Sequence, residues 1–266
     1  MNVEGIFLAN TIILQNDASG TAAATQKTPK LAWLSLLPDA TTKPASSSAL
    51  YDYMNTVKYT AGSATTDLDF TFSSAQDVSY CAVAGANFAD KTCTFEFYTW
   101  DGVAWVKQAD QSGMRNGQPV FLTFDSVSTS QVRFRFICGS SGMDIGELAA
   151  GVTIDFPRPV SVGYTPGRWN NRDQVTSNDT QSNNIGKSTT VTKGTEERVS
   201  IRNITYQWMD SNWTTFKRDG IGYPVWFSWN PTDNPTNVVY GRIITDDSRF
   251  TSSLYADVRF SIRGIV

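Results

Sequence analysis

Two pairs of aspartates stand close enough in the sequence to suggest acid–base chemistry: Asp67 with Asp69, and Asp246 with Asp247. A glycoside hydrolase needs two carboxylates on opposite sides of a cleft, one of them with a raised pKa. Neighbouring aspartates are more often solvated, or bound to backbone amides in turns. We therefore expect neither pair to be catalytic, and we predict a protein that is not an enzyme.

The sequence contains no histidine. This excludes Ser-His-Asp and Cys-His catalysis, histidine-ligated zinc, and a histidine acid or base. Asp233 and Asn234 stand between two prolines and could offer oxygen ligands to calcium, but a plain turn is the simpler interpretation. We expect no catalytic residue, no metal site and no cofactor.

Three cysteines, Cys81, Cys93 and Cys138, all stand in strand-like stretches. Cysteine is among the most buried residue types, so free buried thiols are the favoured interpretation. A disulfide between Cys81 and Cys93, or between Cys93 and Cys138, stays open as an alternative.

Two tryptophans, Trp100 and Trp105, flank the dipeptide Asp101-Gly102, which is a strong hairpin-turn signal. An exposed indole at this turn could stack against a sugar ring. The alternative is that one tryptophan belongs to the core while the other shields a strand. We keep both residues as candidates for sugar stacking.

Length and composition narrow the class of protein. A chain of 266 residues suits one large or two ordinary domains, and 12% aromatic with 18% charged residues suits a β-rich globular protein. The net charge of −3 gives no electrostatic basis for binding nucleic acid. Residues 6–14 are an apolar strand or arm, and the preceding residues carry Glu4 but no basic stretch. We expect no signal peptide, no membrane insertion, and synthesis in a cytoplasm.

The clearest strand signal is the sequence QVRFRFIC at residues 131–138. Phe134 and Phe136 alternate there with Arg133 and Arg135, the period of two that a half-buried strand requires. Further strands are predicted at residues 68–72, 79–84, 93–100, 103–107 and 119–124. Strands at this spacing predict an antiparallel β-sandwich.

The fold class that we predict is mainly β, with two β-rich domains. Pro157 and Pro159 interrupt strand pairing just before the composition becomes polar, so we expect the first domain to end there. The predicted parts are a sandwich with an N-terminal strand or arm at residues 1–160, a polar linker or assembly arm at 161–194, and a smaller β domain at 195–266. The best helix candidate lies at residues 210–219, and we expect at most one or two short helices.

Several motifs in one order resemble a known family. The chain contains FEFYTWDGVAWVKQ, QVRFRFICG and IGELAAGVTIDFPRPVSVGYTPG, with Ile145-Gly146, Gly151, Arg158-Pro159 and Gly163-Tyr-Thr-Pro166 at the matching places. This part resembles the galactose-binding-like, discoidin-type jelly roll of minor tail proteins from tailed bacteriophages. A second part, PVWFSWNPTDNP to ADVRFSIRGIV, is similar to the C-terminal half of the same tail proteins.

The resemblance implies a structural protein of the distal tail, tail tip or baseplate, located in the virion after assembly in the host cytoplasm. Its expected partners are further copies of itself in a ring and other tail proteins, namely tail tube, hub and fibres. No sugar or calcium ligand of the jelly-roll superfamily can be matched here residue by residue. The alternative function is a carbohydrate-binding module that contacts a glycan on the host surface. The candidate assembly contacts are Trp169, Asn170, Val191, Arg259 and Arg263.

Overall fold

The computed structural model describes residues 28–53, 57–166, 171–176 and 189–264, with the backbone alone described for 171–176 and 189–194. The predicted N-terminal strand or arm at 6–14 lies outside this part. The strands are β1 (Lys30–Ala32), β2 (Tyr59–Thr60), β3 (Thr65–Ala84), β4 (Thr94–Trp100), β5 (Trp105–Gln111), β6 (Val120–Ile137), β7 (Asp144–Ile145), β8 (Glu147–Gly151), β9 (Ile154–Asp155), β10 (Asn171–Thr176), β11 (Thr189–Thr205), β12 (Val225–Ser228), β13 (Val238–Asp246), β14 (Arg249–Phe250) and β15 (Tyr255–Gly264). The helices are α1 (Phe88–Lys91), α2 (Tyr206–Trp208) and α3 (Thr215–Asp219).

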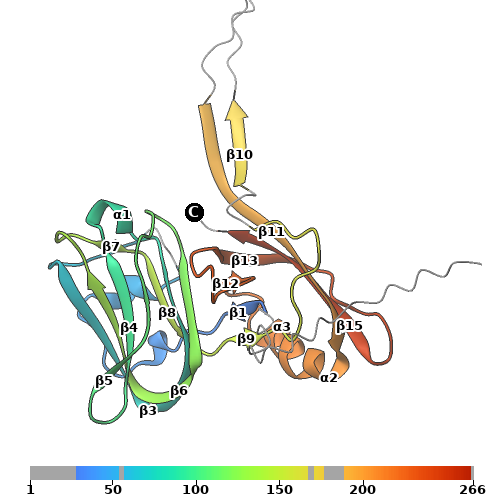
Figure 1. Cartoon of the computed structure of the whole chain (residues 1–266), viewed down its shortest axis with the longest axis horizontal. Helices are drawn as coiled ribbons and strands as arrows, with labels where there is room; N and C mark the ends of the chain where they lie inside the picture. The colour runs from blue at the N-terminus through green and yellow to red at the C-terminus, as the bar shows by residue number, and fades with distance from the viewer. Residues whose placement is uncertain (1–27, 54–56, 167–170, 177–188, 265–266) are drawn as a thin grey trace, which may run out of the picture.

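The first half of the molecule is built on an antiparallel sheet with the order β5-β4-β6-β3-β8, accompanied by the short pair β2-β7 (Figure 1). This confirms the predicted mainly β class with an antiparallel sandwich. One detail of the prediction was wrong. Residues 119–124 and 131–138 are not two strands, because both belong to the single long strand β6, and 68–72 and 79–84 likewise both belong to β3.

The core of the sandwich follows from the alternation along β4 and β6. Phe95 and Phe97 of β4 are buried against Phe134 and Phe136 of β6, with ring centroids 5.0–6.0 Å apart. Because successive side chains of a strand point to opposite faces, Arg133 and Arg135, which alternate with the phenylalanines of β6, lie on the outer face, as predicted. Each buried phenylalanine stabilises the fold by about 1.5–3 kcal/mol relative to an exposed one.

The second half contains the larger sheet, of order β10-β11-β15-β13-β12-β1-β9, with β14 paired to β15. A continuous helical segment at residues 206–219, made of α2, the π-helical turn Met209–Thr214 and α3, covers one face. Its buried Trp213 and Phe216 pack with each other, and Trp213 also packs on Phe260 of β15 at 5.1 Å. The helix predicted at 210–219 is confirmed, with a start four residues earlier. Among the described residues, no helix is long and apolar enough to span a bilayer.

The sandwich is an insertion into the larger sheet. Leu31 of β1 lies opposite Phe227 of β12 on one side and opposite Ile154 of β9 on the other. The chain leaves the large sheet after β1, forms the whole sandwich, and returns at β9. Of the segment predicted as the first domain, β1 therefore pairs with the C-terminal strand β12, and β9 joins the same sheet through β1. Local sequence patterns did not indicate this arrangement.

A buried contact joins the two sheets. Tyr80 and Phe121 of the sandwich, with ring centroids 5.4 Å apart, belong to the same buried cluster as Trp226 and Tyr240 of the large sheet. The phenol of Tyr80 donates a hydrogen bond to the carbonyl oxygen of Leu34 at 2.7 Å. Because these aromatic groups are withdrawn from water, the contact fixes the sandwich against the sheet.

The prediction of free thiols was wrong for two of the three cysteines. Cys93, just before β4, forms a disulfide with Cys138, just after β6, with the Cα atoms 4.0 Å apart. Since β4 and β6 are antiparallel neighbours, the end of one strand lies beside the start of the other. Cys81 is a buried free thiol, as expected. The disulfide links two cysteines that are 45 residues apart in the sequence.

Replacing Cys93 and Cys138 together by alanine should lower the free energy of unfolding by about 2–4 kcal/mol, because the crosslink restricts the unfolded chain. Urea unfolding with and without dithiothreitol measures this. Reduction should destabilise the natural protein by a similar amount and leave the double variant unchanged. An equal effect of the reductant on both proteins would contradict the assigned pairing.

Glu147 is a buried carboxyl group at the start of β8, only 1% exposed. Its Oε2 accepts a hydrogen bond from the backbone N–H of Tyr53 at 3.0 Å. Burial raises the pKa of Glu147 to about 9, and the nearby negative charge of Asp52 acts in the same direction. The folded protein therefore holds this carboxyl group in its neutral form at pH 7.

The raised pKa of Glu147 predicts a loss of stability with increasing pH. In the unfolded chain the carboxyl group ionises near its ordinary pKa of 4.5, whereas in the folded protein it ionises near 9. Between these values the unfolded state binds fewer protons, so the free energy of unfolding should fall by about 1.4 kcal/mol per pH unit. Denaturation from pH 5 to pH 9 measures the slope, and Glu147→Gln should remove it. The same slope in both proteins would contradict the assignment.

Candidate binding surfaces

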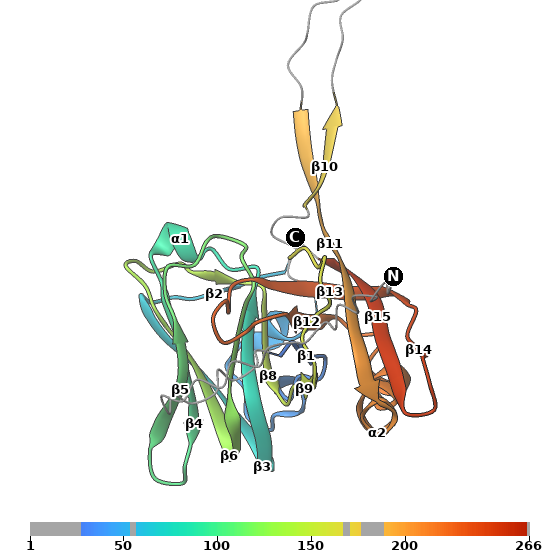
Figure 2. The same ribbon diagram turned by 45° about the vertical axis from the view of Figure 1, so that its right-hand side comes forward.

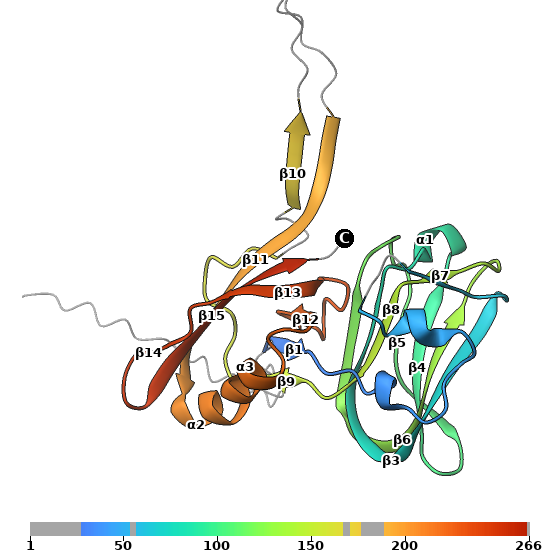
Figure 3. The same cartoon turned by 180° about the vertical axis from the view of Figure 1, so that it is seen from behind.

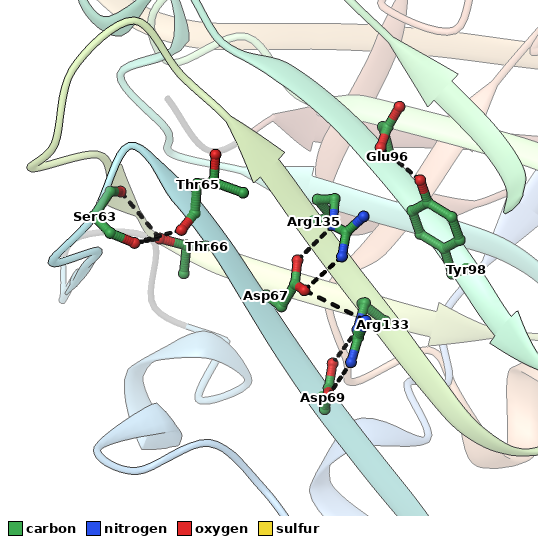
Figure 4. A network of polar contacts seen from close by, with 9 residues as sticks. All are labelled: Ser63, Thr65, Thr66, Asp67, Asp69, Glu96, Tyr98, Arg133 and Arg135. Carbon is green, nitrogen blue, oxygen red and sulfur yellow. Dashed lines mark hydrogen bonds and ion pairs between the residues drawn. The ribbon is translucent and has the colours of Figure 1, made fainter. Parts of the chain in front are cut away.

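The outer face of the sandwich carries a ladder of ion pairs between β3 and β6 (Figure 4). Arg133 lies opposite Asp69 and Arg135 lies opposite Asp67 in the antiparallel register. Each arginine donates from Nε and Nη2 to both carboxylate oxygens of its partner, all at 2.7 Å. Arg133 Nη1 also reaches Asp67 at 3.4 Å, which links the two pairs.

These contacts decide the role of the first aspartate pair. Bidentate hydrogen bonds from Arg135 hold the pKa of Asp67 below its usual value. A general acid needs a raised pKa, and both aspartates are held by fixed guanidinium groups. The ladder therefore presents matched positive and negative groups along one face.

Aromatic side chains border the ladder on β4 and β5. The guanidinium of Arg133 lies 4.2 Å from the ring centroid of Trp105, and that of Arg135 lies 5.3 Å from the ring of Tyr98. The Tyr98 hydroxyl donates a hydrogen bond to Glu96 Oε2 at 2.7 Å (Figure 4). The result is a surface on which aromatic faces and hydrogen-bonding groups alternate.

The two tryptophans proposed for sugar stacking lie together at the end of this surface. Trp100 and Trp105 are directly paired across β4 and β5, with their rings edge to face at 5.4 Å. Both are half-buried. Because Arg133 covers one face of Trp105, a sugar ring can reach only the face of this indole turned away from the arginine.

The second surface lies on the large sheet, where β11 and β15 run antiparallel. A hollow of about 200 Å³ is lined there by Arg198, Ser200, Asp247, Arg259 and Ser261, among others. Arg259 Nη2 donates to Asp257 Oδ2 at 2.8 Å. Its Nε and the hydroxyl of Ser200 are buried and have no hydrogen-bond partner in the described part of the chain.

Of the remaining candidate assembly contacts, two lie in strands of the large sheet and two lie outside the described residues. Arg263 is exposed on β15, opposite Glu196 of β11 on one side and Arg242 of β13 on the other. Val191 belongs to β11, where its backbone pairs with that of Gln174 in β10. Trp169 and Asn170 lie outside the described residues.

The other acidic candidates form local structure. Asp246 binds Lys217 of α3 at 2.7 Å, so this carboxylate links the helix to β13. Asp233 accepts a hydrogen bond from the Asn230 side chain at 3.1 Å, and the Asn234 amide bonds to the Asn230 carbonyl, so this stretch is a turn. Among the described residues, no group of three or more His, Cys, Asp or Glu side chains is arranged to hold a metal ion.

The comparisons with known proteins are as follows. No family model matches the chain, and no curated protein matches it. Among solved structures, a pectin-binding carbohydrate-binding module aligns at 14% identity over 42% of this chain and 87% of its own, with a TM-score of 0.32. A CBM32 module produced by Clostridium perfringens aligns at 19% identity over 48% of this chain and 95% of its own, with a TM-score of 0.34.

A third solved structure is the CBM32 of AlyQ in complex with 4,5-unsaturated mannuronic acid, at 16% identity over 42% of this chain and 90% of that one, with a TM-score of 0.34. All three are carbohydrate-binding modules, and each aligns to less than half of this chain. At these identities and TM-scores they carry no conclusion about what this chain binds.

Replacing Asp67 by Asn should lower the free energy of unfolding by about 1 kcal/mol or less at pH 7, since partly exposed ion pairs contribute little. Because the folded state lowers the pKa of Asp67, its ion pair adds to the free energy of unfolding above the unfolded pKa of 3.8. This contribution is lost as the pH falls through the folded pKa. Urea unfolding at pH 7 and at pH 2.5 measures this, and the difference between Asp67→Asn and the natural protein should be smaller at pH 2.5.

Asp110 provides the matched control for this variant. It is exposed and lies 3.7 Å from Lys107 without a bidentate partner. Asp110→Asn should therefore change the stability less than Asp67→Asn at pH 7. A difference between Asp67→Asn and the natural protein that persists unchanged at pH 2.5 would show that the ion pair is not its cause.

Proposed function

We propose that this protein is a structural component of a bacteriophage tail that acts by assembling with further copies of itself and with other tail proteins. The motifs within the sandwich and in the C-terminal strands support this assignment by resemblance. The structural observation that supports it most directly is the hairpin formed by β10 and the first part of β11. We also propose that the protein is not an enzyme and that it resides in the virion.

The hairpin extends beyond both sheets in all three views of the molecule (Figures 1–3). Val175 of β10 pairs with Thr190 of β11, whereas β11 pairs with β15 only from Glu196 onward. In the described part of the chain, β10 is therefore an edge strand, and the first residues of β11 pair with β10 alone. Unpaired amides and carbonyls on such edges bind a strand of another chain.

The arginine face at the base of the hairpin provides a second contact. Arg198 and Arg259 project from neighbouring strands around the hollow, and Arg263 is exposed further along β15. Arg259 is bound to Asp257, so the exposed Arg198 and Arg263 are the positive groups that suit an acidic surface on a neighbouring subunit. In a ring, the same two surfaces of every copy would meet in a repeated heterologous contact that closes by rotation.

The second candidate function is glycan binding by the sandwich, and the surface beside Trp105 favours it. Aromatic rings stack on the apolar face of a sugar, while carboxylates and guanidinium groups hydrogen-bond its hydroxyls. Tyr98, Trp105, Glu96 and the arginines of β6 supply both kinds of group on one face. Because the sandwich is an insertion, a tail protein could carry such a surface without interrupting its assembly sheet.

Replacing residues 172–192 by a short Gly-Ser turn should abolish self-association and leave the monomer folded. The large sheet keeps its pairing because β11 and β15 pair from Glu196 to Thr205. Sedimentation velocity measures the association state, and circular dichroism measures the fold. Hydrogen exchange of the natural protein should also show slow amides at 171–176 and 189–195 in the assembled state and fast ones in the monomer.

The turn between β14 and β15 offers a matched control, because Leu254 at its tip is 67% exposed and the turn is also a hairpin end. Shortening this turn should leave self-association unchanged. If the hairpin deletion assembles as well as the natural protein, or if the exchange rates are the same in both states, the hairpin is not the assembly element.

A further inference from the structure

A small cleft lies where the insertion meets the large sheet, and we call it the junction cleft. Its volume is about 230 Å³, and its lining includes Trp33, Ser35, Asp39, Tyr53, Asp219 and Tyr223. Trp33 to Asp39 follow β1, Tyr53 precedes β2, Asp219 is the last residue of the helical segment, and Tyr223 follows it. Figure 3 shows the chain running from β1 directly into the sandwich. The cleft therefore exists only in the folded arrangement of both halves.

Three aromatic rings form one side of the junction cleft. Tyr223 lies 5.9 Å from Tyr53 and 6.4 Å from Trp33 between ring centroids, with the rings tilted to each other by 58° and 36°. Trp33 is half-buried, and Tyr223 remains 47% exposed. Tyrosine and tryptophan that keep an exposed face are suited to contact a ligand with both apolar and polar groups.

The backbone holds these rings in place at some cost. Tyr53 has a φ of 63°, a left-handed conformation that is unfavourable for a non-glycine residue. Its amide is bound by the buried carboxyl of Glu147, which fixes that conformation. Strain of this kind is concentrated at functional sites.

Gly220 has a related role beneath Trp33. A Cβ atom at this position would lie 2.7 Å from the Trp33 ring and 2.6 Å from Phe216. Trp33 packs against Phe216 at 6.1 Å, so the glycine permits this position of the indole. Four separate segments thus combine to orient the aromatic wall.

The polar groups of the cleft indicate the charge of a ligand. Asp39 and Asp219 bring carboxylates, but Arg218 binds Asp219 with two hydrogen bonds, and Lys43 donates to the Pro38 carbonyl beside the cleft. Among the described residues, the lining itself contains no basic residue, and Arg218 and Lys43 bring the compensating positive charges beside it. Burial, with the nearby Glu147, raises the pKa of Tyr53, so its phenol remains a hydrogen-bond donor.

We propose that the junction cleft binds the terminal ring of a neutral saccharide. The aromatic wall would stack on the apolar face of the sugar, while Asp39, Asp219 and the Ser35 hydroxyl would hydrogen-bond to its hydroxyls. The volume is below the range of about 300–1,000 Å³ typical of sites for drug-sized ligands, which suits one ring and not a longer chain segment. This inference rests on glycan binding as the second candidate function, and it places the site away from the Trp105 surface.

The test is binding of the full chain to an array of neutral oligosaccharides ending in galactose, glucose, mannose or N-acetylhexosamines, with glucuronate- and glucosamine-terminated glycans as charged arms. The best neutral glycan is then titrated by calorimetry. Tyr223→Ala and Asp39→Asn should each weaken binding at least tenfold, because one removes the stacking surface and the other a hydrogen-bond acceptor. A preference for a charged terminus would overturn the proposal.

Tyr206→Ala is the matched control, since Tyr206 is 51% exposed at the opposite end of the same helical segment. It should bind as the natural protein does, and all variants should show the natural thermal unfolding. Unchanged binding in both Tyr223→Ala and Asp39→Asn would overturn the proposal.

Trp105→Ala separates the two glycan sites. Binding that depends on Trp105 but not on Tyr223 would place the glycan on the sandwich surface, so the junction cleft would fail while the second candidate function stands. If no glycan binds to the natural protein at millimolar concentration, both fail together, and the assembly function remains to be judged by sedimentation alone.

Discussion

The pairing of β1 with β9 is the constraint on which the rest of the molecule depends. These strands hold the two ends of the inserted sandwich side by side, and β1 also pairs with β12 in the large sheet. Closing a long loop costs conformational entropy, but the cost rises only slowly with loop length. The buried cluster of Tyr80, Phe121, Trp226 and Tyr240 then adds apolar contact across the junction. Strand pairing and this buried cluster together hold the two sheets against each other.

The alternation of residues predicted much of the sandwich. Phe134 and Phe136 point to the core and Arg133 points outward, because a strand buried on one face leaves this pattern in the sequence. The length of the strands could not be predicted in the same way. The pairing of β3 is irregular between Thr71 and Gln76, which interrupts the alternation of residues although the strand continues. The sequence of this one bulged strand therefore has the pattern of two separate strands.

Contacts between distant segments account for what the sequence did not predict. Nothing near Cys93 marks Cys138 as its partner, since their closeness follows from the pairing of β4 with β6. The arginine partners of Asp67 and Asp69 likewise required the register of β3 against β6. The junction cleft is an extreme case, because Trp33, Tyr53 and Tyr223 belong to three segments whose local patterns indicate only loops and short strands.

The position of the junction cleft links ligand binding to the arrangement of the two halves. Tyr53 belongs to the inserted part and Tyr223 follows the helix of the large sheet, so a ligand that contacts both rings binds only while the halves remain docked. Such a ligand stabilises the docked state in proportion to the logarithm of its concentration relative to its Kd. The hairpin extends from the same large sheet through β11, which runs unbroken from the hairpin into the sheet. The large sheet would therefore connect a sandwich that contacts a surface to a hairpin that contacts a neighbouring subunit. A ligand in the junction cleft would make the connection between the sandwich and the large sheet more rigid.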